Sequence, residues 1–293
     1  MRNQINIFNK INSFKKKIEV DGDKSISIRS VLLASQAIGK SQIFNLLESE
    51  DVMHSLKCIR KLGIVYKKHN NYYEIYGRGL NGFETNSNKI LNAGNSGTLA
   101  RLILGLLVNT TDSIKIIGDK SLSKRDFSRV TEPLKLFGAN ISSNNNKLPV
   151  TIRGSNFLRP IKYYEKLGSA QCKSAVMLAA LKTPGNTQIK AKKSRNHTEL
   201  FFKHLKIPIK INKIKNFDNI LVKGVSNYRG FKYSIPGDIS SSSFFIVLTL
   251  LSNNSSLVIK NVNINESRIG IIKILNKMNA RIILKNKKSY KGE

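Results

Sequence analysis

An internal repeat of about 70 residues limits the possible folds of this 293-residue chain more than any other feature. Four segments begin with a glycine and small polar residues and lead into an apolar stretch, and their glycines are 72, 74 and 69 positions apart. These glycines are Gly22, Gly94, Gly168 and Gly237. A β-rich segment, a second helical pattern and a further strand follow each apolar stretch. We therefore expect an α/β (α+β) fold made of repeated strand–helix–strand–helix–strand units.

The apolar stretches that follow the glycines predict helices. A glycine before a polar N-cap residue is a helix start signal. The stretches have no wide polar face, so we expect sheets to bury them; they read SVLLASQAI, ARLILGLLV, SAVMLAAL and SFFIVLTLL. Closing strands are predicted, for example, at residues 71–77 and 280–285.

The helix starts also predict anion binding. Free backbone N–H groups and the positive end of the helix dipole attract anions, and several converging helix starts would suit a multiply anionic substrate. In the first unit, Lys24 stands at the helix entrance, and Ser25 and Arg29 share one helix face because they are four residues apart. An ordinary capped helix with a solvated Lys and Arg explains this motif equally well.

The second and third units carry further candidate ligands for an anion. Gly94 and Gly97 flank Asn95 and would let a backbone approach a ligand closely. The other candidates are basic or small polar residues near helix starts, and each has a simpler explanation as a cap, a solvated basic loop or a structural His: Lys120, Lys124, Arg125, Arg129, Ser169, Gln171, Ser194, Arg195 and His197.

The net charge of +32 raises the question of nucleic-acid binding. The Lys residues are spread along the whole chain and form no basic stripe or aromatic RNA-binding motif, so a site for small polyanions suits the charge better. Cys58 and Cys172 fit a reducing cytoplasm, and with four His they show no metal-ligand spacing. No apolar run reaches the ~18 residues of a membrane span, and no signal peptide is recognisable.

Six ordered motifs resemble those of the 3-phosphoshikimate 1-carboxyvinyltransferase (EPSP synthase) family, from about residue 16 to residue 285. They are GDKSISIRSVLLASQAIGKSQIFNLLESEDV, LNAGNSGTLARLILGLL, GDKSLSKRDFSRVTEPLKLFGA, GSAQCKSAVMLAAL, SRNHTEL and PGDISSSSFFIVLTLL. The resemblance implies βαβαββ units in two inside-out domains, with four of the family's six units present. Residues 23–236 would form a complete three-unit domain, and residues 1–22 with 237–293 an incomplete one.

The resemblance also implies an activity of the shikimate pathway to chorismate and the aromatic amino acids. The family transfers the enolpyruvyl group of phosphoenolpyruvate to the 5-hydroxyl of 3-phosphoshikimate, needs no cofactor or metal, and is expected to be a cytoplasmic monomer when full length. Matched by motif, the 3-phosphoshikimate ligands are Lys24, Ser25, Arg29, Ser169, Ala170, Gln171 and Ser194. The phosphoenolpyruvate ligands are Lys24, Gly97, Arg125 and Gln171.

Three departures from the family pattern leave alternatives open. Asp21-Gly22 replaces Pro-Gly, and Ile28 replaces a His or Asn. The family's catalytic Asp and Glu would lie beyond Glu293, so no catalytic residue is matched, and we expect a C-terminally truncated copy. The alternatives are an inactive remnant of this enzyme and, less favoured, a nucleic-acid-binding protein. A related enzyme that acts on a UDP-amino sugar is also disfavoured, because neither Cys lies in a reactive loop.

Overall fold

The computed structural model describes residues 11–85, 88–224 and 227–291 in two compact units. Unit 1 comprises residues 1–23 and 236–288, and unit 2 comprises residues 24–235 and 289–293. The domain boundaries implied by the resemblance, 23–236 and 1–22 with 237–293, remain a prediction. Within these ranges, residues 1–10, 86–87, 225–226 and 292–293 lie outside the described residues.

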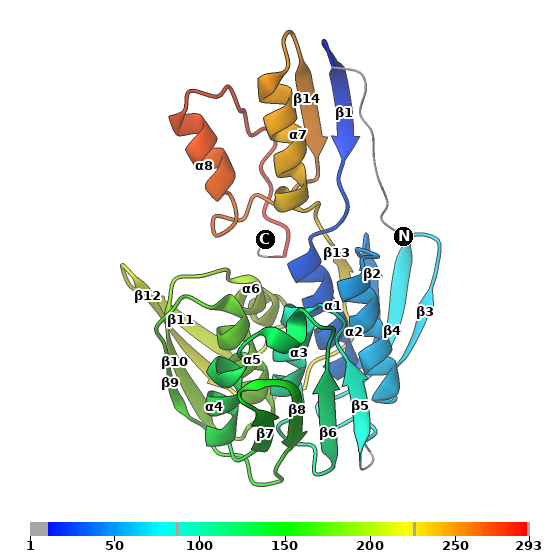
Figure 1. Cartoon of the computed structure of the whole chain (residues 1–293), viewed down its shortest axis with the longest axis vertical. Coiled ribbons are helices and arrows are strands. Elements are labelled where there is room, and N and C mark those ends of the chain that lie inside the picture. The colour runs from blue at the N-terminus through cyan, green and yellow to red at the C-terminus, as the bar shows by residue number, and fades with distance from the viewer. Residues whose placement is uncertain (1–10, 86–87, 225–226, 292–293) are drawn as a thin grey trace. The chain divides into compact units, whose positions relative to one another are not determined.

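Unit 2 contains three four-stranded sheets with the same pattern of pairing (Figure 1). In each sheet an edge strand pairs in parallel with its neighbour, and the two remaining pairs are antiparallel. The first sheet is β13 (Lys232–Ser234), β2 (Ile38–Phe44), β4 (Tyr72–Arg78) and β3 (Val65–Lys68). The second is β5 (Lys89–Asn92), β6 (Ser113–Ile117), β8 (Lys147–Arg153) and β7 (Asn140–Asn144). The third is β9 (Lys162–Glu165), β10 (Asn186–Lys192), β12 (Phe217–Lys223) and β11 (Ile209–Lys213). The predicted α/β class is confirmed, and a strand covers most of the predicted segment 71–77.

Two kinds of helix alternate with these strands in unit 2. The helices that follow the glycine-led starts are α1 (Lys24–Gln36), α3 (Gly97–Leu106) and α5 (Ala170–Lys182). The helices that follow the second strand of each sheet are α2 (Glu50–Lys61), α4 (Ser128–Leu136, preceded by the 3-10 turn Leu122–Lys124) and α6 (His197–His204).

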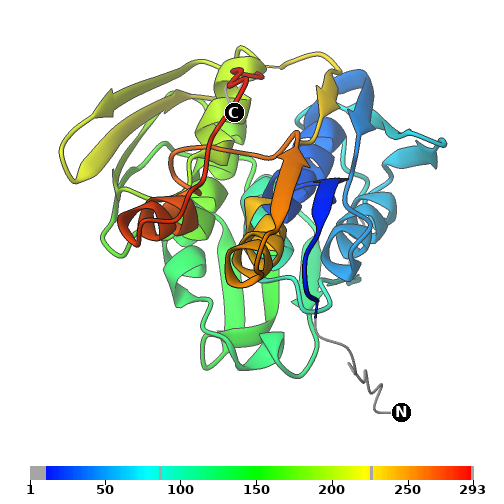
Figure 2. The same ribbon diagram turned by 90° about the horizontal axis from the view of Figure 1, so that it is seen from above.

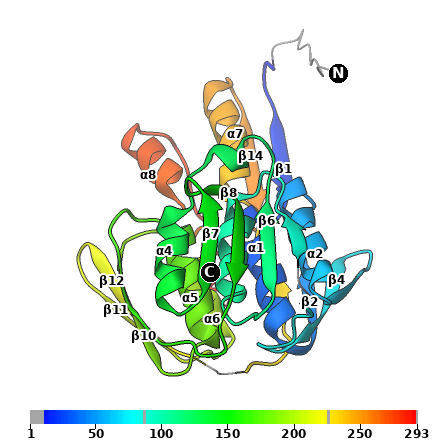
Figure 3. The ribbon, with the colours of Figure 1, turned by 60° about the horizontal axis from the view of Figure 1, so that its bottom comes forward.

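Helices α1, α3 and α5 form the interior of unit 2, between the sheets (Figures 1 and 3). Nearly every residue of these helices is buried, as expected for helices that are apolar on all sides. Gly94 and Gly168 have φ angles of +56° and +72°, a left-handed conformation that favours glycine, and each lies in the tight turn before a helix. At these two positions the repeated glycine therefore directs the chain into α3 and α5.

Unit 1 is smaller. Strands β1 (Lys15–Glu19) and β14 (Ser256–Lys260) pair in parallel and lie side by side (Figure 2). Helices α7 (Ile239–Leu251) and α8 (Gly270–Lys277) accompany them. The buried apolar cluster of the described part of unit 1 consists of Ile239, Ile269 and Ile272.

Two expectations for unit 1 were wrong. The apolar stretch of α7 was expected to be buried, but only Ile239 and Ser242 of this helix are buried, and Leu251 is 80% exposed. The reason is that the described elements of unit 1 provide one two-stranded sheet and one further helix, too little surface to surround α7. Residues 280–285 were predicted to form a strand but pair with no strand among the described residues, although Ile282 and Leu284 pack on the small core.

Candidate functional site

The sequence-predicted ligands in unit 2 lie at the starts of α1, α3 and α5 and in two loops beside them. Ser96 and Ser169 cap α3 and α5 by accepting hydrogen bonds from backbone N–H groups, and both hydrogen bonds are 3.3 Å long. Ala170 is the first residue of α5 and, like Ser169, is partly exposed. These helix starts therefore present polar groups and backbone N–H groups together.

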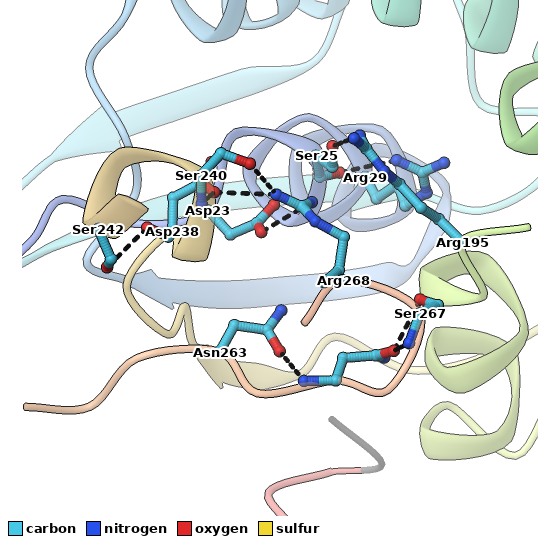
Figure 4. Close-up of polar contacts among 11 residues, drawn as sticks. Asp23, Ser25, Arg29, Arg195, Asp238, Ser240, Ser242, Asn263, Ser267 and Arg268 are labelled. Carbon is cyan, nitrogen blue, oxygen red and sulfur yellow. Dashed lines mark hydrogen bonds and ion pairs between the residues drawn. The ribbon is translucent and has the colours of Figure 1, made fainter. Parts of the chain in front are cut away.

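The start of α1 meets the loop between β10 and α6. Arg195 donates from Nη1 to Ser25 Oγ over 3.4 Å, which joins residues 170 positions apart (Figure 4). Next to Arg195 in sequence, Ser194 has a buried Oγ with no hydrogen-bond partner among the described residues. Lys24 forms an ion pair with Asp51 at 3.0 Å, and its side chain is 51% exposed.

Arg29 lies beneath this site and joins three helices. Its guanidinium donates to Thr198 Oγ1 (2.8 Å), to Ser174 Oγ (3.0 Å) and to the Ser25 carbonyl (2.9 Å). The Ser174 and Thr198 hydroxyls also bond each other at 2.7 Å. Arg29 is 4% exposed, so these contacts fix α1 against α5 and α6. Its predicted contact with 3-phosphoshikimate stays a prediction.

Arg101 performs the same task between α3 and α5, and sequence reasoning missed it. It donates from Nη1 to Gln171 Oε1 (3.0 Å) and to the Gly97 carbonyl (3.3 Å). Gln171 in turn donates to Thr98 Oγ1 at 2.9 Å. Arg101 lies seven residues after Gly94, as Arg29 lies seven after Gly22, so alignment of the repeats could have found it.

The loop after β6 brings a second guanidinium to α3. Arg125 donates from Nη2 to Asn95 Oδ1 at 3.0 Å, and Arg101 donates to the Asp126 carbonyl at 3.0 Å. A Cβ atom on Gly97 would lie 2.8 Å from Arg101 Nη1 and 3.1 Å from Arg125 Nη1, so only glycine leaves both guanidinium groups in place. The structure thus gathers Gly97, Arg125 and Gln171 around Arg101.

The electrostatics of this cluster favour anions. Burial lowers the pKa of Arg101, and the positive charges of Arg125 and Arg129 act in the same direction. An anion placed among these groups would offset their mutual repulsion. Burial also raises the pKa of the Cys58 thiol to about 12, which argues against nucleophilic thiol chemistry there.

The described residues offer neither a metal cluster nor a membrane span. They contain no group of three or more His, Cys, Asp and Glu side chains arranged to hold a metal ion. None of the helices in this part of the chain is both long and apolar enough to cross a bilayer.

The fold and these groups define an α/β protein of repeated units in which basic and small polar groups lie at the starts of α1, α3 and α5. A family model described as EPSP synthase (3-phosphoshikimate 1-carboxyvinyltransferase) matches residues 8–292. The chain belongs to this family.

Curated and solved relatives agree with the family match. The chain is 40% identical over 291 residues to the 3-phosphoshikimate 1-carboxyvinyltransferase of Syntrophomonas wolfei and 39% identical over 278 residues to that of Lactococcus lactis. These alignments cover 97% and 93% of this chain. An Acinetobacter baumannii EPSP synthase structure has a TM-score of 0.86 and 33% identity over 96% of this chain. The chain spans 67% and 64% of the length of the two curated relatives and 63% of that structure's chain.

Proposed function

We propose that this chain binds 3-phosphoshikimate and phosphoenolpyruvate and that the protein acts as a 3-phosphoshikimate 1-carboxyvinyltransferase. The observation that supports the proposal most directly is the convergence of the predicted ligands on the starts of α1, α3 and α5 within unit 2. Both substrates are multiply anionic, and the cluster supplies guanidinium, ammonium, hydroxyl and backbone N–H groups.

Each ligand group has a defined place in this proposal. Ser25, Ser169 and Ser194 hold the phosphate of 3-phosphoshikimate, and the buried, unpartnered Oγ of Ser194 supports this role. A buried hydroxyl without a partner costs stability, so a ligand oxygen there would supply the missing hydrogen bond. Arg29 fixes α1 and completes the predicted set with Ala170.

The phosphoenolpyruvate groups bind beside α3 in the same proposal. The Gly97 N–H and the Arg125 guanidinium bind its carboxylate or phosphate, and Gln171 and Lys24 contact both substrates. Charge neutralisation lets the two anions approach each other, and the fixed groups orient the 5-hydroxyl toward the enol carbon. Addition and then elimination of orthophosphate complete the transfer, and we assign its proton transfers to no residue of this chain.

Calorimetric measurement of 3-phosphoshikimate binding to the full chain tests the site. We expect saturable binding and at least a tenfold loss of affinity, about 1.4 kcal/mol, in Lys24→Ala. Lys135→Ala is the control: Lys135 forms an ion pair with Glu132 at 3.0 Å, as Lys24 does with Asp51, and their side chains are 44% and 51% exposed. Equal losses of affinity in the two variants would show that binding depends only on the overall charge of the chain, which would contradict a specific site.

Two further measurements separate the alternatives. Phosphate release from the chain incubated with both substrates tests turnover; binding without release would favour an inactive remnant. Duplex DNA and RNA titrations at physiological salt should show binding no tighter than that of a generic polycation, because the Lys residues are spread along the whole chain. We also propose a cytoplasmic monomer, in agreement with free, buried Cys58 and Cys172; light scattering tests the oligomeric state.

A further inference from the structure

A buried carboxylate in unit 2 lies at the entrance to α5. It belongs to Glu165, the last residue of β9, whose side chain is 3% exposed. Glu165 Oε2 accepts a hydrogen bond from the Gly168 N–H at 2.6 Å, and Oε1 accepts one from the Leu167 N–H at 3.2 Å. Arg129 of α4 forms an ion pair with the same Oε1 at 3.5 Å. Both carboxylate oxygens are therefore engaged, and each bonds the backbone of the segment that enters α5.

The segment that Glu165 bonds leads directly into three of the predicted ligands. Residues 166–168 connect β9 to α5, Ser169 caps the helix, and Ala170 and Gln171 are its first two residues. Gly168 has a φ angle of +72°, a conformation that glycine reaches easily but also leaves easily, because it has no Cβ atom. A hydrogen bond to its N–H therefore restrains the most permissive residue before the cap.

The start of α5 is held from two sides within unit 2. On one side, Gln171 is bonded by α3, through Arg101 at 3.0 Å and Thr98 at 2.9 Å. On the other side, Glu165 bonds the turn before the cap, and α4, which carries Arg129, lies beside α5 (Figure 3). The predicted ligands of the α5 start thus lie between two anchors, and Glu165 supplies the anchor that α3 does not.

A carboxylate suits this position for two reasons. It offers two acceptor oxygens, so it can bond two neighbouring N–H groups at once, and hydrogen bonds to a charged acceptor are short and strong. Its negative charge would repel an anionic ligand nearby, but the Arg129 guanidinium and the two N–H groups offset that charge. Glutamine has the same shape but a single acceptor oxygen, and its NH₂ group cannot accept a hydrogen bond from an N–H.

We infer that Glu165 is a positioning residue for the candidate site: by bonding the Leu167 and Gly168 N–H groups, it fixes the turn that presents Ser169 and Ala170. The inference deepens the proposed function and rests on it for the identity of the ligand. The restrained turn itself is a property of unit 2 that can be measured without a ligand.

The test compares Glu165→Gln with the control Glu74→Gln in the full chain. Glu74 is also a buried glutamate of unit 2, 6% exposed, and it forms an ion pair with Lys40 at 3.3 Å. Its carboxylate is bonded by side chains of β2 and β4, those of Gln42 and Tyr76, and lies in a different sheet from Glu165. The measurements are the chemical shift and hydrogen exchange of the Gly168 amide, by NMR, and calorimetric binding of 3-phosphoshikimate.

We expect Glu165→Gln to move the Gly168 amide proton upfield, because its short bond to a charged acceptor is lost. Exchange of this amide should become about tenfold faster and 3-phosphoshikimate binding about tenfold weaker, as for the loss of one hydrogen bond to a charged group. Glu74→Gln should match the natural chain in all three measurements, even if it unfolds more easily. An unchanged Gly168 amide or unchanged affinity in Glu165→Gln, or equal changes in Glu74→Gln, would overturn the inference.

A failure of the proposed function gives a different result. If the natural chain does not bind 3-phosphoshikimate, the proposed function fails, and the shift and exchange of the Gly168 amide alone decide the role of Glu165. If Glu165→Gln does not fold, Glu165→Asp replaces it, because Asp keeps the negative charge but its shorter side chain withdraws the carboxylate from the turn. Faster exchange at Gly168 in that variant supports the inference, and exchange as in the natural chain overturns it.

Discussion

At the scale of single residues, two arginines join the helix starts of the candidate site. Arg29 and Arg101 occupy equivalent positions in two repeats, and each donates to the carbonyl of the residue four positions earlier. Each then reaches a side chain on another helix. These two residues therefore position helix starts relative to one another within unit 2, in addition to any contact with a ligand.

Replacing Arg101 by Lys should loosen Gln171. The charge is kept, but the fork that bonds Gln171 Oε1 and the Asp126 carbonyl is lost, so we expect about 2 kcal/mol less stability in urea unfolding. Phosphoenolpyruvate affinity should fall as well. Arg153→Lys is the control, because exposed Arg153 makes a 3.0 Å bond to the Thr111 carbonyl. An Arg101→Lys variant as stable as this control would contradict the assigned role.

Lys182 should make the stability of the chain depend on pH. Burial lowers its pKa from the usual 10.5 to about 7, and its Nζ donates to the Leu80 carbonyl and to Asn109 Oδ1. Between pH 7 and 10.5 the unfolded chain binds more protons at this group than the folded chain does. The free energy of unfolding should therefore rise with pH across this interval, by at most about 1.4 kcal/mol per pH unit.

The variant Lys182→Met isolates this effect. The contribution of Lys182 is absent in the variant, so the difference in unfolding free energy between the two proteins should change between pH 7 and 10.5. Urea unfolding at several pH values measures it. A constant difference over this range would show that Lys182 titrates normally in the folded protein.

Sequence reasoning located candidate ligands at this scale but not the buried cation at the far end of α5. Ser25, Ser169 and Gln171 follow a repeated glycine and are visible in the sequence. Lys182 is a basic residue in a chain with 50 of them, and nothing in its local sequence distinguishes a buried cation from a solvated one. Its partner Leu80 lies 102 positions away.

At the scale of elements, Ser96 and Ser169 are equivalent helix caps with different surroundings. Each accepts a 3.3 Å hydrogen bond from the N–H three residues later, but Ser96 is fully buried and Ser169 is partly exposed. Alanine at either position should cost about 1 kcal/mol of stability. Only Ser169→Ala should also weaken 3-phosphoshikimate binding, as calorimetry would show. Equal binding by both variants would remove Ser169 from the ligand set.

The order of elements could be predicted from the sequence, but their burial could not. The glycine-led segments correctly predicted helices α1, α3, α5 and α7, because a capped apolar stretch is a signal contained in the local sequence. Burial depends on what packs around the helix. Leu104 in α3 is fully buried and Phe244 in α7 is 78% exposed, although both lie in strongly apolar stretches. Residues 280–285 likewise alternate between partly buried and exposed positions, yet no strand of the described residues pairs with them.

At the scale of the whole molecule, positive charge lies mainly at the surface. Of the 18 acidic residues, Asp23, Glu74, Glu165, Glu199 and Asp238 are buried, whereas few of the 50 basic residues are. The buried acids pair with bases, as in the Lys173–Glu199 pair, and leave the surface strongly positive. Adding NaCl should screen this repulsion and raise the melting temperature. Calorimetric scans at NaCl concentrations from about 0.05 to about 0.5 M measure the melting temperature. A melting temperature that falls as salt is added would contradict this expectation.

The two units should lose their structure separately, because their cores differ greatly in size. Unit 2 has an extensive buried cluster, and the described part of unit 1 has three buried isoleucines. Removing side-chain volume from a core destabilises mainly the cooperative unit that contains it. Ile272→Ala should therefore accelerate hydrogen exchange in α7 and β14 while exchange in α3 stays slow. Leu104→Ala should have the opposite pattern, at a cost of about 2–5 kcal/mol to unit 2. If either variant accelerates exchange equally in both units, the chain unfolds as one cooperative body.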